Sequence, residues 1–270
     1  MSSLGEFITT HRRLWVLTGA GISTGSGIPA YRDERGVWKQ RKPIYYQDFI
    51  RSLQARQRYW ARSMLGWPRI AAATPHRSHL ALAALERSGR IHQLTTQNVD
   101  RLHQQAGSRQ VIELHGSLQQ VVCLGCGTRL PRAAIQRWLL ERNSQLQHTE
   151  VESAPDGDAW LESIDFNSLQ IPDCEQCGGV LKPDVVFFGE NVPAVRVERC
   201  FTTLQQADAV LVIGSSLMVY SGYRFVRRAH ELGLPIVAVN RGVTRADDLL
   251  SRKFEHDCGT ALEQALEDLY

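Results

Sequence analysis

The sequence predicts an α/β fold in which helices cover both faces of a doubly wound parallel sheet. Short apolar runs rich in β-branched residues alternate along the chain with helical patterns, which is typical of strands buried on both faces. The first run leads directly into the glycine-rich stretch "GAGISTGSG" (19–27). A turn of this kind commonly connects the first strand of such a sheet to the element that follows it.

Six apolar runs are expected to be strands: "LWVLTGA" (14–20), "IHQLTTQ" (91–97), "VIELHG" (111–116), "DVVFFG" (184–189), "AVLVIGSS" (209–216) and "PIVAVN" (235–240). Three helices are expected near them. "TPHRSHLALAALERSG" has Thr74 as N-cap, Pro75 at the first helical position and Gly89 at its end. "GYRFVRRAHELG" is a crossover helix that ends at Gly233, and "TALEQALEDL" is a terminal amphipathic helix.

Two segments between the predicted strands interrupt this alternation. Residues 38–73 are helical and basic in pattern, and residues 120–183 contain two cysteine pairs. We therefore expect a Rossmann-like domain formed by residues 1–37, 90–119 and 184–270. A smaller, discontinuous domain is expected to combine a helical module (38–89) with a four-cysteine module (120–183).

Composition excludes several classes of protein. The net charge of +3 is too small to indicate binding to nucleic acid or to a membrane surface, and no apolar run approaches the ~18 residues of a membrane span. The N-terminal stretch contains an acidic residue and lacks the apolar core of a signal peptide. We expect a cytoplasmic, monomeric protein.

Four of the six cysteines form two C-x-x-C pairs, Cys123 with Cys126 and Cys174 with Cys177. Two such pairs on tight turns can place four thiolates around one ion, which predicts a structural zinc site without an open coordination position. Redox chemistry would need one C-x-x-C and does not explain two. The 47 residues between the pairs are more than a simple zinc ribbon contains.

The first glycine-rich loop has part of a dinucleotide-binding fingerprint. Gly19 and Gly21 fit G-x-G-x-x-G, but Thr24 occupies the place of the third glycine. Backbone amides in such a loop can approach a diphosphate, although an ordinary glycine turn remains an alternative. The acid that a dehydrogenase places on the next strand is absent, because the chain enters a polar helical segment there. This pattern disfavours hydride transfer.

The predicted strands end in polar residues. In an open α/β sheet, ligands gather at the carboxyl ends of the strands, so these side chains should converge. His115 is the natural general base, and Asn98 with Asp100 matches the donors and acceptors of a carboxamide. No Ser-His-Asp order is apparent, which disfavours a covalent hydrolase. The converging residues are Gln97, Asn98, Asp100, His115, Ser215, Ser216 and Asn240.

Taken in order, these motifs resemble the sirtuins, NAD-dependent protein-lysine deacylases. The resemblance runs from Trp15 to Cys258 and is carried by "GAGIS", "GIPAYR", "TQNVDRLH", "ELHGS", both C-x-x-C pairs, "PDVVFFGE" and "GSSL". The stretches "RQRYWARSMLGWP", "APDGD", "GSSLMVYSGYRF" and "TRADDL" are most similar to the class II branch, which includes lipoamidase and mono-ADP-ribosyltransferase activities.

The resemblance implies a role for each matching residue. It makes His115 the catalytic base, assisted by Asn98 and Asp100, and gives zinc to Cys123, Cys126, Cys174 and Cys177. Acyl-lysine would bind at Val186, Phe187 and Gly189. NAD would be held by Gly19, Ala20, Gly21, Ile22, Ser23, Tyr31, Arg32, Gln97, Asn98, Val99, Asp100, Gly214, Ser215, Ser216, Asn240, Arg241, Gly242 and Cys258.

The implied reaction consumes NAD. The acyl oxygen of a substrate lysine attacks C1′ of the nicotinamide ribose, nicotinamide leaves and an imidate forms. His115 deprotonates a ribose hydroxyl, which attacks the imidate, and water releases free lysine and 2′-O-acyl-ADP-ribose. One feature departs from the family: Ala30 stands where its motif carries aspartate, and Asp33 is a candidate substitute.

The acyl preference and two other functions remain open. Tyr59 and Arg62 lie three residues apart on one predicted helix face, like the Tyr-x-x-Arg pair of succinyl-selective sirtuins. A solvated basic helix with buried aromatics is the alternative. Acetyl, lipoyl and other long acyl groups are further candidates. A mono-ADP-ribosyltransferase using the same pocket, or a weakly active sensor of NAD or ADP-ribose, would also fit these motifs.

Overall fold

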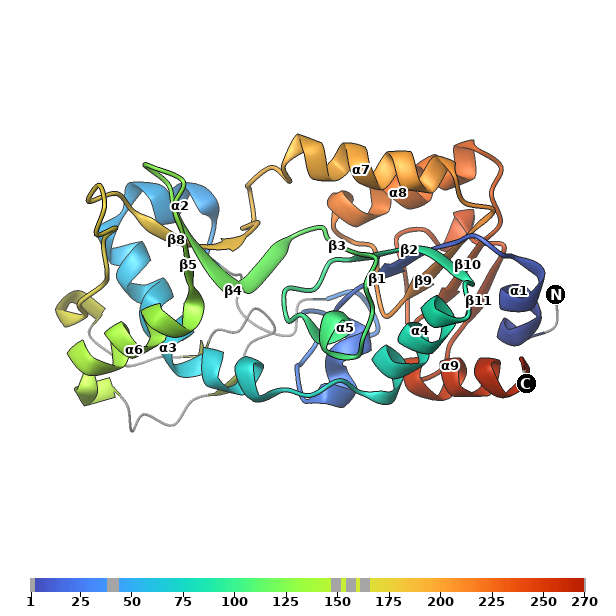
Figure 1. Cartoon of the computed structure of the whole chain (residues 1–270), viewed down its shortest axis with the longest axis horizontal. Coiled ribbons are helices and arrows are strands. Elements are labelled where there is room, and N and C mark those ends of the chain that lie inside the picture. Colours follow the sequence, from blue (N-terminus) through green and yellow to red (C-terminus); the bar gives the residue numbers. More distant parts are fainter. Residues whose placement is uncertain (1–2, 38–43, 147–151, 154–158, 161–165, 270) are drawn as a thin grey trace. The chain divides into compact units, whose positions relative to one another are not determined.

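The computed structural model describes residues 3–37, 44–146, 152–153, 159–160 and 166–269 (Figure 1). The chain forms two compact units. The first, here called the sheet unit, comprises Met1–Gln40, Ala73–Leu114 and Val192–Tyr270. The second, the small unit, comprises Arg41–Ala72 and His115–Asn191.

The sheet unit contains a six-stranded parallel sheet in the order β11-β10-β9-β1-β2-β3, so the predicted doubly wound α/β class is confirmed. If these six strands are numbered 1 to 6 as they occur along the chain, their order across the sheet is 3-2-1-4-5-6, as in Rossmann folds. The strands are β1 (Leu14–Thr18), β2 (Ile91–Thr96), β3 (Val111–Glu113), β9 (Ala209–Ile213), β10 (Ile236–Val239) and β11 (Arg252–Phe254).

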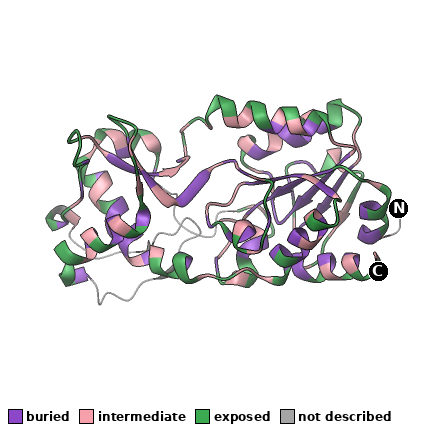
Figure 2. Ribbon diagram, viewed as in Figure 1, coloured by how far each residue is buried: buried purple, intermediate pink, exposed green. Residues whose placement is uncertain are grey.

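Alternate residues of β1 enter two separate cores, as strand geometry requires. Leu14 and Val16 pack in the core that includes α4 and α9, whereas Trp15 and Leu17 pack in the core that includes α7 and α8. Burial colouring shows the strands enclosed and the helices buried on one side only (Figure 2). The helices of this unit are α1 (Leu4–Thr10), α4 (Arg77–Arg87), α5 (Leu102–Gln105), α7 (Ala194–Gln205), α8 (Tyr220–Glu231) and α9 (Cys258–Glu267).

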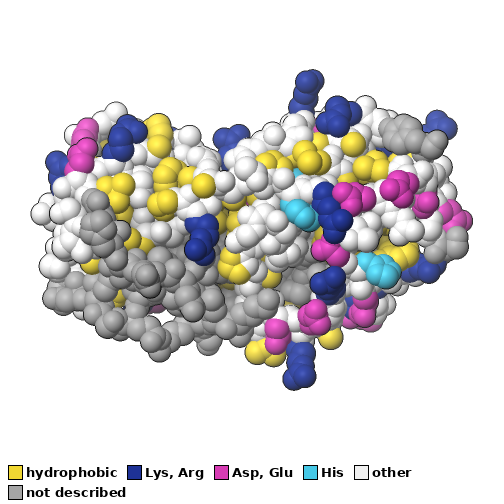
Figure 3. Space-filling model, turned by 90° about the horizontal axis from the view of Figure 1, so that it is seen from below, with side chains coloured by type: hydrophobic (Ala, Val, Ile, Leu, Met, Phe, Trp, Pro, Cys, Tyr) yellow, Lys and Arg dark blue, Asp and Glu magenta, His cyan; other side chains and the backbone are white. Residues whose placement is uncertain are grey.

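The surface of the sheet unit around α4 and α9 mixes charges of both signs (Figure 3). Arg77 of α4 forms ion pairs of 2.9 Å with Asp257 and 2.8 Å with Glu263. Basic and acidic side chains therefore neutralise one another on this face. In the part of the chain that the structure describes, no helix is long and apolar enough to cross a membrane.

The small unit joins helices to a three-stranded antiparallel sheet in the order β5-β4-β8. Its core contains Phe49, Trp60, Val121, Leu139 and Phe187. Its elements are α2 (Tyr46–Arg51), α3 (Leu53–Ala72), β4 (Gly116–Cys123), β5 (Arg129–Pro131), α6 (Arg132–Arg142), β6 (Glu152–Ser153), β7 (Ala159–Trp160) and β8 (Leu181–Val185), with 3₁₀ turns at Ser144–Leu146 and Phe166–Ser168.

Several predicted element boundaries are wrong. Asp184 and Val185 of the run "DVVFFG" are the end of β8, and the rest of the run follows that strand. β8 is antiparallel to its partner rather than part of the parallel sheet, because an apolar run does not distinguish a parallel from an antiparallel partner. The short strand β11 was not expected. Helix α4 begins at Arg77 rather than after Thr74, since the N–H of His76 donates to Nδ1 of His79 (3.2 Å) and starts the helix there.

The positions at which the chain passes from one unit to the other also differ from those expected. The chain does so after residues 72, 114 and 191, whereas the expected domain boundaries follow residues 89, 119 and 183. The physical reason is packing. Ala81, Leu82 and Leu85 of α4 belong to the core of the sheet unit, although residues 77–87 were expected in the helical module. Residues 38–43, the expected start of that module, lie outside the described residues, as does most of the polar stretch 148–158.

Candidate functional site

The loop after β1 lies at the point where the strand order of the sheet reverses, between β1 and β9. Ligands of open α/β sheets bind outside the carboxyl ends of the strands at this point. The loop packs directly on the chain after β9: Gly19 N–H donates to Ile213 O (3.1 Å) and Gly21 N–H to Gly214 O (2.8 Å). A Cβ on Gly21 would lie 2.9 Å from the Cα of Gly214, so this contact requires glycine.

The missing third glycine of the fingerprint has a structural explanation. The residues after Gly19 form the 3₁₀ helix η1 (Ala20–Ser26), and Thr24 is exposed on it. Its hydroxyl donates to Gly21 O (2.9 Å) and closes the turn. Because the Thr24 side chain is exposed, a glycine is not needed there.

Ser23 is the centre of a hydrogen-bond network that joins this loop to the end of β2. The Asn98 side-chain amide donates to Gly19 O (3.1 Å) and to Ser23 Oγ (3.0 Å). The Ser23 hydroxyl donates to Asp100 Oδ2 (2.7 Å), and Asp100 Oδ1 accepts the Leu102 N–H (2.9 Å). Asn98 and Asp100, predicted from sequence as a carboxamide-binding pair, are thus held together by one hydroxyl.

Two buried histidines, His79 and His103, lie next to this network and were not predicted from the sequence. Nδ1 of His79 accepts the His76 N–H, so the proton lies on Nε2, which contacts Ser23 Oγ at 3.4 Å. Nε2 of His103 contacts Thr18 Oγ1 at 2.9 Å. Burial lowers the pKa of His79 to about 4 and lowers the pKa of His103 well below its usual value, so both rings are neutral at pH 7. Two polar residues, Ser78 and His79, on the buried face of an otherwise apolar helix are the signal that could have revealed this.

Asp100 is only 5% exposed, and this burial raises the pKa of its carboxyl group. Hydrogen bonds from Leu102 and Ser23 act in the opposite direction because they stabilise the carboxylate. A buried acid with a perturbed pKa, beside an amide at a strand end, is a candidate functional group.

The other predicted residues of the sheet unit occupy the same carboxyl edge. The Ser215 hydroxyl donates to Gln97 Oε1 (2.6 Å), which links the ends of β9 and β2. The Asn240 side chain donates to Arg241 O (2.9 Å) after β10. Cys258 Sγ lies 3.9 Å from Val239 O, and burial raises the pKa of this thiol to about 12, so it is an un-ionised packing group.

Tyr31 and Arg32 lie half-buried beyond η1. Nη1 of Arg32 donates to Gly36 O (2.7 Å) within its own loop. Asp33 Oδ1 accepts the N–H groups of Arg35 (3.0 Å) and Val37 (2.8 Å). This oxygen therefore closes the turn that Asp33 begins.

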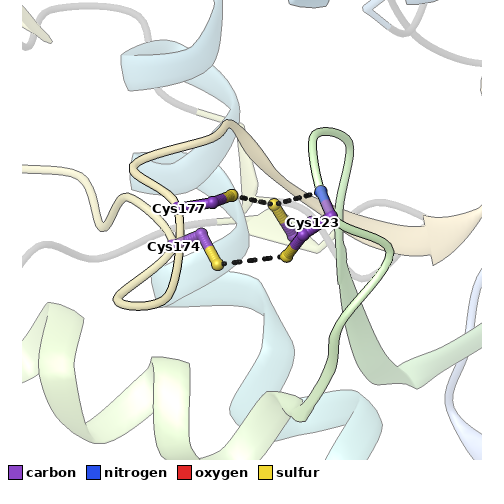
Figure 4. Close-up of side chains that lie close together, drawn as sticks. Cys123, Cys174 and Cys177 are labelled. Atoms are coloured by element: carbon purple, nitrogen blue, oxygen red, sulfur yellow. Dashed lines mark hydrogen bonds between the residues drawn. The ribbon is translucent and has the colours of Figure 1, made fainter.

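In the small unit, the four paired cysteines form one cluster (Figure 4). Cys123 is the last residue of β4 and Cys126 follows it, whereas Cys174 and Cys177 precede β8. Their sulfur atoms all lie within 4.8 Å of one another, with Cys123–Cys177 at 3.5 Å and Cys126–Cys174 at 3.7 Å. Tetrahedral Zn–S bonds of ~2.3 Å place sulfurs about 3.8 Å apart. The cluster therefore fits a structural zinc ion that joins the two loops.

His115 and the predicted acyl-lysine residues also belong to the small unit. Val186 N–H donates to His115 O (2.8 Å), which fixes the backbone of His115 beside the segment after β8. Phe187 is buried, and its ring lies 5.2 Å from that of Tyr59 and 5.1 Å from that of Phe49. Tyr59 is 5% exposed, as the alternative of a basic helix with buried aromatics expected, but Arg62 is only 7% exposed, so the expectation that this arginine is solvated is wrong.

The fold and these sites define a Rossmann-type α/β protein with a four-thiolate metal module. A family model described as "Sir2 family" matches residues 19–221. The chain belongs to the Sir2 family.

Curated relatives share most of the chain. An NAD-dependent protein deacetylase of Xanthomonas campestris pv. campestris (strain 8004) is 58% identical over 260 residues, which are 96% of this chain and 89% of the relative. The NAD-dependent protein lipoamidase sirtuin-4, mitochondrial, of Bos taurus is 48% identical over 265 residues, 97% of this chain and 84% of that one.

Solved structures support the fold. The structure described as "Sir2-p53 peptide-NAD+" has a TM-score of 0.78 at 29% identity and covers 97% of this chain and 95% of its own. A second, described as "Structural Basis for the Mechanism and Regulation of Sir2 Enzymes", has a TM-score of 0.76 at 32% identity and covers 98% and 95%.

Proposed function

We propose that this chain removes acyl groups from protein lysines, consuming NAD and releasing nicotinamide and 2′-O-acyl-ADP-ribose. As a Sir2-family member with relatives named NAD-dependent protein deacetylases, it is an NAD-dependent protein deacetylase. The observation that carries the proposal is the Ser23–Asn98–Asp100 network at the switch point of the sheet. Its Asp100 carboxylate and Asn98 side-chain oxygen are acceptors for the N–H groups of a carboxamide, at the position where this fold binds dinucleotides.

In this proposal the sheet unit is the NAD-binding domain. NAD supplies an electrophilic ribose carbon once its nicotinamide is held. The glycine loop accommodates the diphosphate, with Tyr31 and Arg32 beside it, while Asn98, Val99 and Asp100 orient the nicotinamide. Residues at the ends of β9 and β10 hold the adenosine half: Gly214, Ser215, Ser216, Asn240, Arg241, Gly242 and Cys258.

The small unit provides the base and the acyl-lysine contacts. Val186 N–H donates to the backbone oxygen of His115, and the role assigned to the imidazole of His115 is to accept a proton from a ribose hydroxyl. Val186, Phe187 and Gly189 receive the acyl-lysine. The zinc cluster joins the loops at the ends of β4 and β8, the strands that lead from His115 and to Val186.

For the acyl group we propose an uncharged chain, acetyl or longer. The rings of Tyr59, Phe49 and Phe187 form an apolar cluster next to the proposed lysine contacts. A lipoyl group is included because the Bos taurus relative is named a lipoamidase. Arg62 is buried, and its guanidinium group is the kind that pairs with a carboxylate such as that of a succinyl group. A succinyl peptide is therefore the comparison that tests the proposed preference for an uncharged chain. We further propose that the protein acts as a monomer in the cytoplasm on protein substrates.

One incubation tests the function. The protein is mixed with NAD and with acetyl-, lipoyl-, succinyl- and long-chain acyl-lysine peptides, and mass spectrometry follows both peptide and nucleotide products. The expected result is free lysine peptide with 2′-O-acyl-ADP-ribose, lost in His115→Ala. ADP-ribose attached to protein instead would indicate a mono-ADP-ribosyltransferase. Binding of NAD without any product would indicate a sensor.

A further inference from the structure

Lys182 is an almost fully buried cation in the small unit, near the end of β8. Its side chain is 4% exposed, and its Nζ lies 3.0 Å from Glu190 Oε2. The same nitrogen donates to Val185 O (2.5 Å) and lies 4.7 Å from the centre of the Phe187 ring. A lysine is rarely buried to this degree unless its charge is paired and hydrogen-bonded.

Glu190 uses one oxygen for two purposes. Its Oε2 pairs with Lys182 and also accepts the Phe187 N–H (2.8 Å), while Glu190 N–H donates to Phe187 O (3.0 Å). The carboxylate thus closes the turn formed by residues 187–190. Gly189, with φ +78°, supplies the left-handed conformation that this turn needs.

Two backbone hydrogen bonds also anchor this segment at its ends. Val186 N–H donates to His115 O (2.8 Å), and Tyr46 N–H donates to Phe188 O (2.9 Å). Neither backbone contact involves the Phe187 ring, which packs against the rings of Phe49 and Tyr59. Lys182 adds the contact that links this ring to the turn, because its ammonium group lies over the ring and its partner Glu190 accepts the Phe187 N–H.

We propose that the Lys182–Glu190 ion pair is the positioning device for acyl-lysine binding. It fixes the turn 187–190 so that Phe187 and Gly189 meet the substrate. This inference rests on the proposed function, which assigns Val186, Phe187 and Gly189 to the acyl-lysine. Lys182 and Glu190 are positioning residues, because they act through Phe187.

Glu190 is more exposed than Lys182, so the two single substitutions should affect stability differently. Glu190 is 22% exposed, so in Lys182→Met water can solvate its carboxylate while the bond to Phe187 N–H persists. In Glu190→Gln, an amide oxygen can still accept that N–H, but Lys182 remains charged in a dry site. Glu190→Gln should therefore lower the melting temperature more than Lys182→Met. The double variant, with neither charge, should recover much of that loss.

The experiment measures steady-state kinetics with an acetyl-lysine peptide and NAD. Lys182→Met and the double variant should raise the KM for peptide roughly tenfold or more, since small misplacements of binding groups have effects of this order. The KM for NAD should stay within about twofold, a limit well below one factor of ten in affinity. A purely structural role would make peptide KM recover together with the melting temperature in the double variant; here only the melting temperature recovers.

Arg129→Met is the matched control. It removes the 3.0 Å ion pair between Arg129 and Asp184 of β8, a residue outside the turn 187–190, and the Arg129 side chain is 61% exposed. This control should leave the KM for peptide unchanged. If wild-type protein deacetylates the peptide and Lys182→Met has the same KM for peptide, the inference is wrong. If wild-type protein yields no product with any acyl peptide, the proposed function itself has failed.

Discussion

The close contact between the glycine loop and the chain after β9 can be measured with one pair of substitutions, Gly214→Ala and Gly27→Ala. Both glycines have left-handed backbone conformations, with φ +61° at Gly214 and +81° at Gly27. Their surroundings differ. A Cβ on Gly214 would lie 2.4 Å from Ile22 N and 2.7 Å from Gly21 C, whereas a Cβ on Gly27 would meet nothing within 4 Å.

The expected costs follow from this difference. An alanine in the left-handed region costs about 1–2 kcal/mol at either position. At Gly214 the clash involves backbone atoms of Gly21 and Ile22, which cannot rotate away, and overpacking of this kind adds about 1–3 kcal/mol. Gly214→Ala should therefore destabilise the sheet unit by about 1–3 kcal/mol more than Gly27→Ala.

Thermal unfolding followed by circular dichroism is the assay. In domains of this size, 1 kcal/mol shifts the melting temperature by about 2–4 °C, so Gly214→Ala should melt about 2–12 °C below Gly27→Ala. Gly214→Ala should also raise the KM for NAD, because the clash displaces the glycine loop. Equal melting temperatures for the two variants would refute the argument that loop and strand end are in obligatory contact.

Three further outcomes are expected. Between pH 6.5 and about 4, His79 is protonated in the unfolded chain but stays neutral in the folded protein, so the free energy of unfolding falls as pH falls, by up to about 3 kcal/mol. In His79→Gln, the melting temperature should therefore fall less across this pH range than in the wild-type protein. Ser23→Ala leaves Asn98 and Asp100 without their shared partner and should cost about 1–3 kcal/mol, seen as a lower melting temperature together with slower nicotinamide release. Cys174→Ser should reduce bound zinc well below one equivalent by atomic absorption and selectively destabilise the small unit, while chelator treatment of wild-type protein reproduces both effects.

The strands of the central sheet could be predicted because both faces are buried. A run such as "AVLVIGSS" has no solvent face that requires polar residues, so β9 appears in the sequence as an uninterrupted apolar stretch. The edge strand β11 contains Arg252 and Lys253 in three residues and carries no such signal. The segment around β8 was assigned to the wrong sheet, because its apolar residues pack in the core of the small unit but give the same local pattern.

Site residues could be predicted where polar side chains directly follow a predicted strand. Asn98 and Asp100 follow a strand directly, so their convergence with the glycine loop could be expected. His79 could not be placed in this way, because it reaches Ser23 only through the packing of α4 on the sheet. Lys182 gives no sequence signal either: a lysine between Leu181 and Pro183 suggests a solvent-facing strand position until its burial is known.

Ala30 remains the one departure from the sirtuin motif, and the structure limits how it can be compensated. Asp33 was the candidate substitute for the missing aspartate. Its Oδ1 accepts two backbone N–H groups, from Arg35 and Val37, and its own N–H donates to Val37 O (2.9 Å). Moving this carboxylate toward position 30 would leave both amides without their partner, at a cost of about 1 kcal/mol for each lost bond. Asp33 therefore stays in its own turn, and the loop beside Arg32 lacks the fixed charge that the motif normally places at position 30.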